Sequence, residues 1–164
     1  MNEEFIKKAN LALSQCLNKS SFITATYFDI NTEEKKLSFS RAGHCPSLIH
    51  CLENDIVSFL ESDGMGLGII RNSKYNNYVH GNTISYGEGD TLLLYTDGIT
   101  EAKSLDGEQF GSERLKRSFE THRSKSPNQI KEGIKNDLSE FTGEIDIDDD
   151  YTLVIIRFKD CNND

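Results

Sequence analysis

The chain has 164 residues and fits a single domain spanning residues 1–164, since domains typically hold about 100–150 residues. The formal net charge of −9 argues against a nucleic-acid partner, because contacts to phosphate need clustered Lys and Arg. No apolar run approaches the roughly 20 residues of a membrane span and no signal peptide is visible, so we expect a cytoplasmic protein.

The first half of the chain predicts one helix followed by a series of strands. Apolar residues at helical spacing predict an amphipathic helix over residues 3–18. The alternating, β-branched and aromatic segment 22–30 predicts a strand, and residues 36–43 its hairpin partner. Residues 47–52 and 55–60 predict two further short strands around a turn.

The second half begins with a glycine-dense loop at residues 64–69 and an expected strand at 78–86. The nearly continuous apolar run 91–96 is typical of a central strand buried on both faces. Two helices and a last strand are then expected over residues 112–121, 127–141 and 151–158. This order of elements favours an α+β fold with mostly antiparallel sheets and helices outside them.

Carboxylates stand next to two of these expected strands. Asp97 directly follows the buried strand, and Gly98 permits a sharp turn after it. Asp149 and Asp150 close an acidic run just before the last strand. If the two strands are neighbours, the carboxylates converge at one sheet end, where hard oxygen ligands would select Mg²⁺ or Mn²⁺. The alternative is a simple Asp-Gly turn and an acidic surface loop.

Five short motifs decide between these interpretations. They are S-R-A-G-H-C-P (40–46), G-L-G-I (66–69), G-D-T-L-L-L-Y-T-D-G-I-T-E-A (89–102), F-G-S-E-R-L (110–115) and D-D-Y-T-L (149–153). In this order the series resembles the PPM (type 2C) metal-dependent serine/threonine phosphatases, in the bacterial branch of the stage II sporulation phosphatase and the sigma-factor regulators. The resemblance implies an antiparallel β-sandwich flanked by helices, a four-layer α-β-β-α fold that is incomplete at its N-terminus.

The resemblance also implies a site that holds two ions, Mg²⁺ or Mn²⁺. Asp97 and Asp149 match the family's metal ligands, while Asp150 and Gly98 match positions that support them. A water or hydroxide between the ions would attack phosphoserine or phosphothreonine in line, so no side-chain nucleophile is expected.

Two further positions have accessory roles by resemblance, and each has a structural alternative. Glu101 and His44 match positions that lie near an accessory metal in related phosphatases. Glu101 could equally form a salt bridge or cap the following turn. His44 could be an ordinary hydrogen-bonded histidine at a strand end.

One family motif has no match in the chain. The family supplies a further metal-binding Asp from a Gly-Asp-Val-x-Gly-His-Gly segment upstream of the first helix, and the sequence contains no such segment. We therefore expect this chain alone to be a poor or inactive phosphatase. We also expect its open sheet edges to favour a homodimer, and an upstream sensory or regulatory region to precede it in the full protein.

Three functions follow as alternatives. The first is a phosphatase acting on a phosphoprotein, by resemblance a phosphorylated anti-sigma-factor antagonist. The second is a phosphatase-like module that binds a partner without hydrolysis, and the third is a structural domain with an acidic rim. The sequence disfavours three other kinds of site. Residues 64–68 lack the spacing of a dinucleotide loop. The His-Cys pairs at 44–45 and 50–51 are adjacent strand residues that point to opposite faces, with no C-x-x-C in the chain, and residues 146–150 lack the Gly and the distal Glu of a calcium loop.

Overall fold

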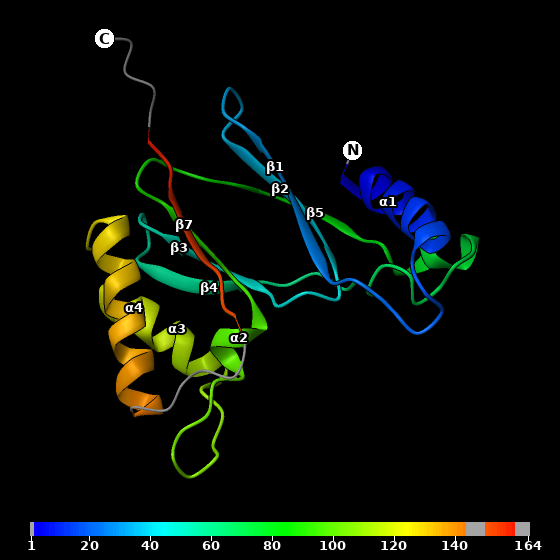
Figure 1. Cartoon of the computed structure of the whole chain (residues 1–164). Helices are drawn as coiled ribbons and strands as arrows, with labels where there is room; N and C mark the ends of the chain where they lie inside the picture. Colours follow the sequence, from blue (N-terminus) through cyan, green and yellow to red (C-terminus); the bar gives the residue numbers. More distant parts are fainter. Residues whose placement is uncertain (1, 144–149, 160–164) are drawn as a thin grey trace. The chain divides into compact units, whose positions relative to one another are not determined.

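The computed structural model describes residues 2–143 and 150–159, which belong to two compact units (Figure 1). The first unit is formed within Met1–Pro46 and Glu61–Tyr86, and the second within Ser47–Leu60 and Gly87–Asp164. Each unit has its own antiparallel sheet and its own helices. The expected α+β fold with antiparallel sheets is therefore confirmed, whereas the single domain stays a prediction.

The first unit is a three-stranded sheet with the order β1-β2-β5 and a helix packed on it. Its strands are β1 (Ala25–Asn31), β2 (Lys36–Ala42) and β5 (Gly81–Ser85). Helix α1 (Asn2–Cys16) contacts β1 and β2, and also the short 3-10 helix η1 (Ser73–Tyr78). The first expected helix and the first expected hairpin are thus both present.

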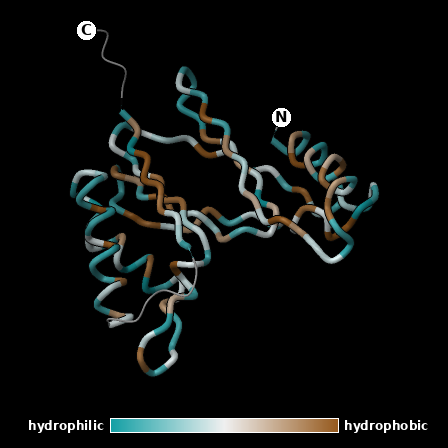
Figure 2. Tube along the Cα trace, viewed as in Figure 1, coloured by the Kyte–Doolittle hydropathy of each residue, from teal (hydrophilic) through white to brown (hydrophobic). Residues whose placement is uncertain are grey.

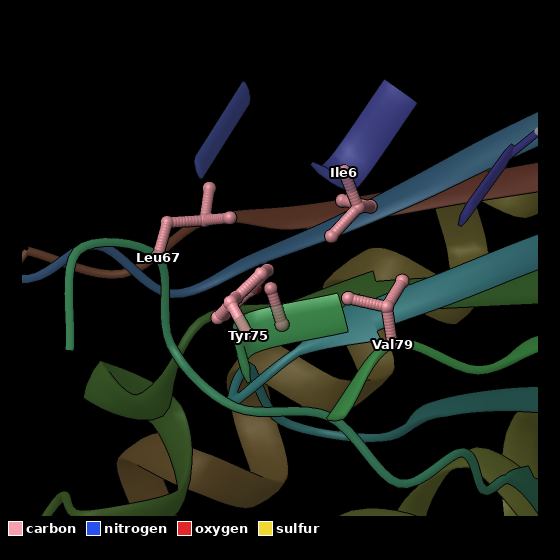
Figure 3. Packing of buried hydrophobic residues seen from close by; sticks show 5 residues of the cluster. Ile6, Leu67, Tyr75 and Val79 are labelled. Carbon is pink, nitrogen blue, oxygen red and sulfur yellow. The ribbon is translucent and has the colours of Figure 1, made fainter. Parts of the chain in front are cut away.

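A small hydrophobic core holds α1 against this sheet (Figure 3). Its buried members are Ile6, Ala42, Leu67, Tyr75 and Val79. The hydroxyl of Tyr75 donates to the Met65 carbonyl at 2.7 Å, and burial raises the pKa of Tyr75 to about 12. The glycine-dense loop is tied to α1 as well, because Asn10 accepts from the Gly68 amide at 2.8 Å.

The expected strand at 78–86 is wrong at its beginning. Tyr78 ends η1, and β5 begins only at Gly81. The side chain of Asn72 caps η1 by accepting from the Lys74 amide. This 3-10 turn buries Tyr75, which is only 1% exposed, in the core described above. Burial of one aromatic side chain therefore outweighs the strand propensity of the residues that follow it.

The second unit has a four-stranded antiparallel sheet with the order β4-β3-β6-β7. Its strands are β3 (Ser47–Cys51), β4 (Ile56–Leu60), β6 (Thr91–Tyr95) and β7 (Leu153–Arg157). Two longer helices, α3 (Gly111–His122) and α4 (Pro127–Thr142), pack on each other and contact β4 and β7 respectively (Figure 1).

Strand β6 is a central strand, as its sequence predicts. Leu92 and Leu93 are completely buried, and β6 pairs with β3 on one side and with β7 on the other. The β7 trace is mostly hydrophobic (Figure 2), although β7 lies at the edge of the sheet. Within the described residues, no helix is both long and apolar enough to cross a membrane.

Candidate metal-binding site at the end of β6 and β7

Asp97 lies at the point where the central strand of the second unit ends. It is the first residue of α2 (Asp97–Thr100), a single helical turn closed by a 2.8 Å hydrogen bond from the Glu101 amide to the Asp97 carbonyl. Asp97 is exposed, whereas Gly98 and Ile99 behind it are buried. The buried turn therefore fixes the backbone of Asp97 while its carboxylate remains accessible to solvent.

The segment before β7 lies directly against this turn. Strands β6 and β7 are antiparallel, and Tyr95 pairs with Leu153 at their common end. A Cβ atom on Gly98 would come within 2.7 Å of the Asp150 carbonyl oxygen. Only glycine permits this contact, which brings the backbones of Gly98 and Asp150 together. The two segments therefore meet at one sheet end, whereas the expected convergence of their carboxylates stays a prediction.

Asp149 was expected to be the second metal ligand, but it lies outside the described residues. Among residues 2–143 and 150–159, no group of three or more His, Cys, Asp or Glu side chains is arranged to hold a metal ion. Asp97 and Asp150, whose segments meet here through the backbone, both have exposed carboxylates. Carboxylate oxygens are the ligands that Mg²⁺ and Mn²⁺ prefer. The donor type of these two residues fits such ions.

The two accessory positions lie in different units. Glu101 is exposed and is the C-terminal cap residue of α2, so it belongs to the same unit as Asp97. His44 follows β2 in the first unit, where its Nδ1 atom lies 3.1 Å from the Thr24 hydroxyl. The backbone carbonyl of His44 accepts from the Arg41 guanidinium at 2.7 Å. These contacts are those of a hydrogen-bonded histidine at a strand end.

Thr96 and Thr152 were not expected at this site. Two hydrogen bonds between them join the ends of β6 and β7. The Thr96 amide donates to the Thr152 carbonyl at 3.2 Å, and the Thr152 amide donates to the Thr96 hydroxyl at 2.9 Å. The sequence does contain a signal for this pair of hydrogen bonds. One threonine stands between the apolar strand and Asp-Gly, and the other ends the D-D-Y-T segment.

Comparisons with known proteins place this arrangement in a family. The family model for stage II sporulation protein E matches residues 2–159. The phosphoserine phosphatase RsbU of Bacillus subtilis is 26% identical over 156 residues, which cover 95% of this chain. They cover 45% of RsbU, so the chain spans about half the length of this relative.

Solved structures agree on the fold. The manganese-presoaked phosphatase domain of SpoIIE from Bacillus subtilis has a TM-score of 0.69 and 24% identity, over 98% of this chain and 67% of that domain. The SiaA-PP2C domain of Pseudomonas aeruginosa has a TM-score of 0.78 and 21% identity, over 96% of this chain and 61% of that one. Because the family model matches residues 2–159, the chain belongs to the stage II sporulation protein E (SpoIIE) family, and it has the PP2C-type phosphatase fold of that family.

Proposed function

We propose that this chain is part of a domain that hydrolyses phosphoserine or phosphothreonine in a phosphoprotein by a metal-dependent reaction, and that the chain alone is a poor or inactive phosphatase. The observation that carries the proposal is the contact between the Asp97 turn and the Asp150 segment, which Gly98 permits by having no side chain. Asp97 and Asp150 are both exposed; Asp97 follows the buried central strand β6, and Asp150 precedes the edge strand β7. The family membership and the manganese-presoaked SpoIIE domain support the same function.

In this proposal, each residue of the site has a defined role. Asp97 and Asp149 hold Mg²⁺ or Mn²⁺, which when bound would supply an activated water and charge stabilisation for attack on phosphorus. Asp150 supports these ligands, and Gly98 permits the close approach of the two segments. Glu101, which caps the α2 turn that begins at Asp97, is an accessory group near a further ion. No side chain of the protein needs to act as a nucleophile.

The substrate class follows from the relatives rather than from the geometry. RsbU is named a phosphoserine phosphatase, which supports a phosphorylated regulatory protein, such as an anti-sigma-factor antagonist, as the substrate here. We further propose that the reaction occurs in the cytoplasm, where such a regulator would be found. We also propose that a sensory or regulatory region controls this reaction. That region would lie in the part of a longer protein that corresponds to the rest of RsbU.

The test compares the wild-type chain with Asp97→Asn in Mn²⁺ binding and in hydrolysis of a phosphoserine peptide. Because the amide is a weaker ligand than the carboxylate, we expect Asp97→Asn to weaken Mn²⁺ binding by roughly tenfold or more, with a matching loss of hydrolysis. Asp63→Asn is the matched control, since it removes the same charge from an exposed position in the first unit.

Two results would change the proposal. If Asp97→Asn binds Mn²⁺ as tightly as the wild type, the residue only forms a turn and the proposed site is wrong. If the product purified from its native cell also binds Mn²⁺ and the phosphopeptide without hydrolysis, the non-catalytic binding module becomes the better explanation. Repeating the assay on the product purified from its native cell separates a truly inactive protein from one that needs a longer chain.

A further inference from the structure

The pairing of β6 with β7 continues one residue beyond Tyr95 and Leu153, to Thr96 and Thr152, but one of the two hydrogen bonds there has a side-chain acceptor in place of a backbone carbonyl. The Thr96 amide donates to the Thr152 carbonyl at 3.2 Å. In return, the Thr152 amide donates to the hydroxyl Oγ1 of Thr96 at 2.9 Å. In a regular antiparallel pair this second bond would go to the Thr96 carbonyl. The side chain of Thr96 therefore stands in for its own backbone carbonyl.

The Thr96 carbonyl is occupied elsewhere. It accepts from the Ile99 amide at 3.2 Å, the bond that begins the turn of α2. Thr96 precedes this helix with extended backbone angles of φ −101° and ψ 162°, which suit a β-branched residue. Its hydroxyl makes no capping bond to α2. Because the carbonyl of Thr96 accepts from α2 and its hydroxyl accepts from Thr152, the chain can leave the strand at Asp97 while Thr152 stays paired.

We infer that Thr96 is a positioning residue for the metal site, an inference that rests on the proposed function. Its hydroxyl fixes Thr152 two residues from Asp150, and its carbonyl fixes the turn that starts at Asp97. Between these two bonds lies the close contact of Gly98 with the Asp150 carbonyl. Thr96 thus sets the spacing between the two carboxylate-bearing segments without contacting a metal or substrate itself.

The first experiment tests the geometry without metal. Thr96→Val keeps the shape of the side chain and removes the acceptor, whereas Thr96→Ser keeps the hydroxyl. We expect the Thr152 amide proton, followed by NMR hydrogen exchange, to exchange about fivefold or more faster in Thr96→Val and near the wild-type rate in Thr96→Ser. Thr121→Val is the matched control, because that hydroxyl only donates to the Arg117 carbonyl of its own helix.

The second experiment measures Mn²⁺ affinity in the same set of chains by calorimetry. We expect Thr96→Val to bind about tenfold more weakly, while Thr96→Ser and Thr121→Val keep the wild-type affinity. Unchanged exchange at Thr152, or faster exchange with unchanged Mn²⁺ affinity, would overturn the inference. If the wild-type chain binds no Mn²⁺, it is the proposed function that fails, and amide exchange then decides alone whether Thr96 holds the segments together.

Discussion

Asp55 is a residue whose charge ties two elements of the second unit together. It lies in the turn between β3 and β4, and its carboxylate accepts from the Arg123 guanidinium at 2.7 and 2.5 Å. The ring of His50, which is 2% exposed, lies 3.0 Å from the same carboxylate. The hydrogen bonds from Arg123, and next that with His50, hold the pKa of Asp55 well below its ordinary value.

This lowered pKa predicts a pH-dependent contribution to stability. A carboxyl whose pKa is lower in the folded than in the unfolded state stabilises the fold fully above its unfolded pKa of about 4. The contribution is lost as the pH falls from there through the folded pKa. We expect Asp55→Asn to lower the melting temperature at neutral pH and to differ progressively less from the wild type in acid. Asn also tolerates the positive φ of 55° at this position.

Thermal unfolding of both chains across this pH range is the measurement. Asp63→Asn is the control, since it makes the same substitution at an exposed position of the other unit. A difference between wild type and Asp55→Asn that stays constant into acid would show that the carboxylate charge does not stabilise the fold.

The residues of the candidate site were predictable where the cause is local. Asp97 and Gly98 follow an apolar run, and that pattern alone indicates a carboxylate at the end of a buried strand. The role of Thr96 was not predictable, because it depends on a hydrogen bond to a residue 56 positions later. The ion pair between Asp55 and Arg123, 68 positions apart, was hidden for the same reason.

At the scale of elements, α3 and α4 meet through a contact that needs a glycine. A Cβ atom on Gly133 of α4 would lie 2.5 Å from the ring of His122 in α3. That ring is held in place by Asp137, whose Oδ2 lies 3.0 Å from Nε2 of His122. Asp137 also accepts from the Ser118 hydroxyl at 2.5 Å. Gly133 therefore lets the two helices approach closely around a hydrogen-bonded histidine.

The contact reverses the usual effect of replacing a helical glycine by alanine. The substitution normally stabilises a helix by about 1 kcal/mol. Here we expect Gly133→Ala to destabilise the fold by about 1–3 kcal/mol, because the ring of His122 must move and lose its bond to Asp137. Chemical denaturation gives the free energy of unfolding. The control is the same substitution in a His122→Ala chain, where we expect no penalty; equal effects in both backgrounds would contradict the proposed contact.

Elements with a strong periodic pattern were predictable from the sequence, and short ones were not. The expected helix at 127–141 corresponds to α4, whose buried Ile130, Ile134 and Leu138 form one face and whose start has a capping box at Ser126. In contrast, α2 and η1 have only four and six residues and carry no periodicity. They exist because tertiary packing buries Ile99 and Tyr75, respectively, and a local pattern cannot indicate that.

At the scale of the whole molecule, each sheet ends in strands that are paired on one side only among the described residues. The sheet of the second unit ends at β4 and β7, and that of the first unit at β1 and β5. Edge strands present unpaired backbone groups that can pair with another chain. Strand β7 has consecutive β-branched residues at 154–156, and Val154 is 41% exposed. This edge is a better template for pairing than a short, charged edge would be.

We therefore predict that the chain forms a homodimer through the β7 edge. Val154→Lys should shift the mass measured by light scattering from dimer toward monomer, because a lysine on an edge strand opposes pairing with a second strand. Ile56→Lys is the matched control. It places the same charge on the opposite edge of the same sheet, at a residue that is 54% exposed, and should leave the dimer intact.

The two variants distinguish an edge-specific dimer from general hydrophobic association. If β7 pairs with a second copy, only Val154→Lys dissociates the dimer. If exposed apolar residues merely adhere, both substitutions reduce the mass to similar extents. A monomeric wild-type chain at every concentration would show the dimer prediction to be wrong. The free edge of β7 would then be covered within a longer chain or remain open to another partner.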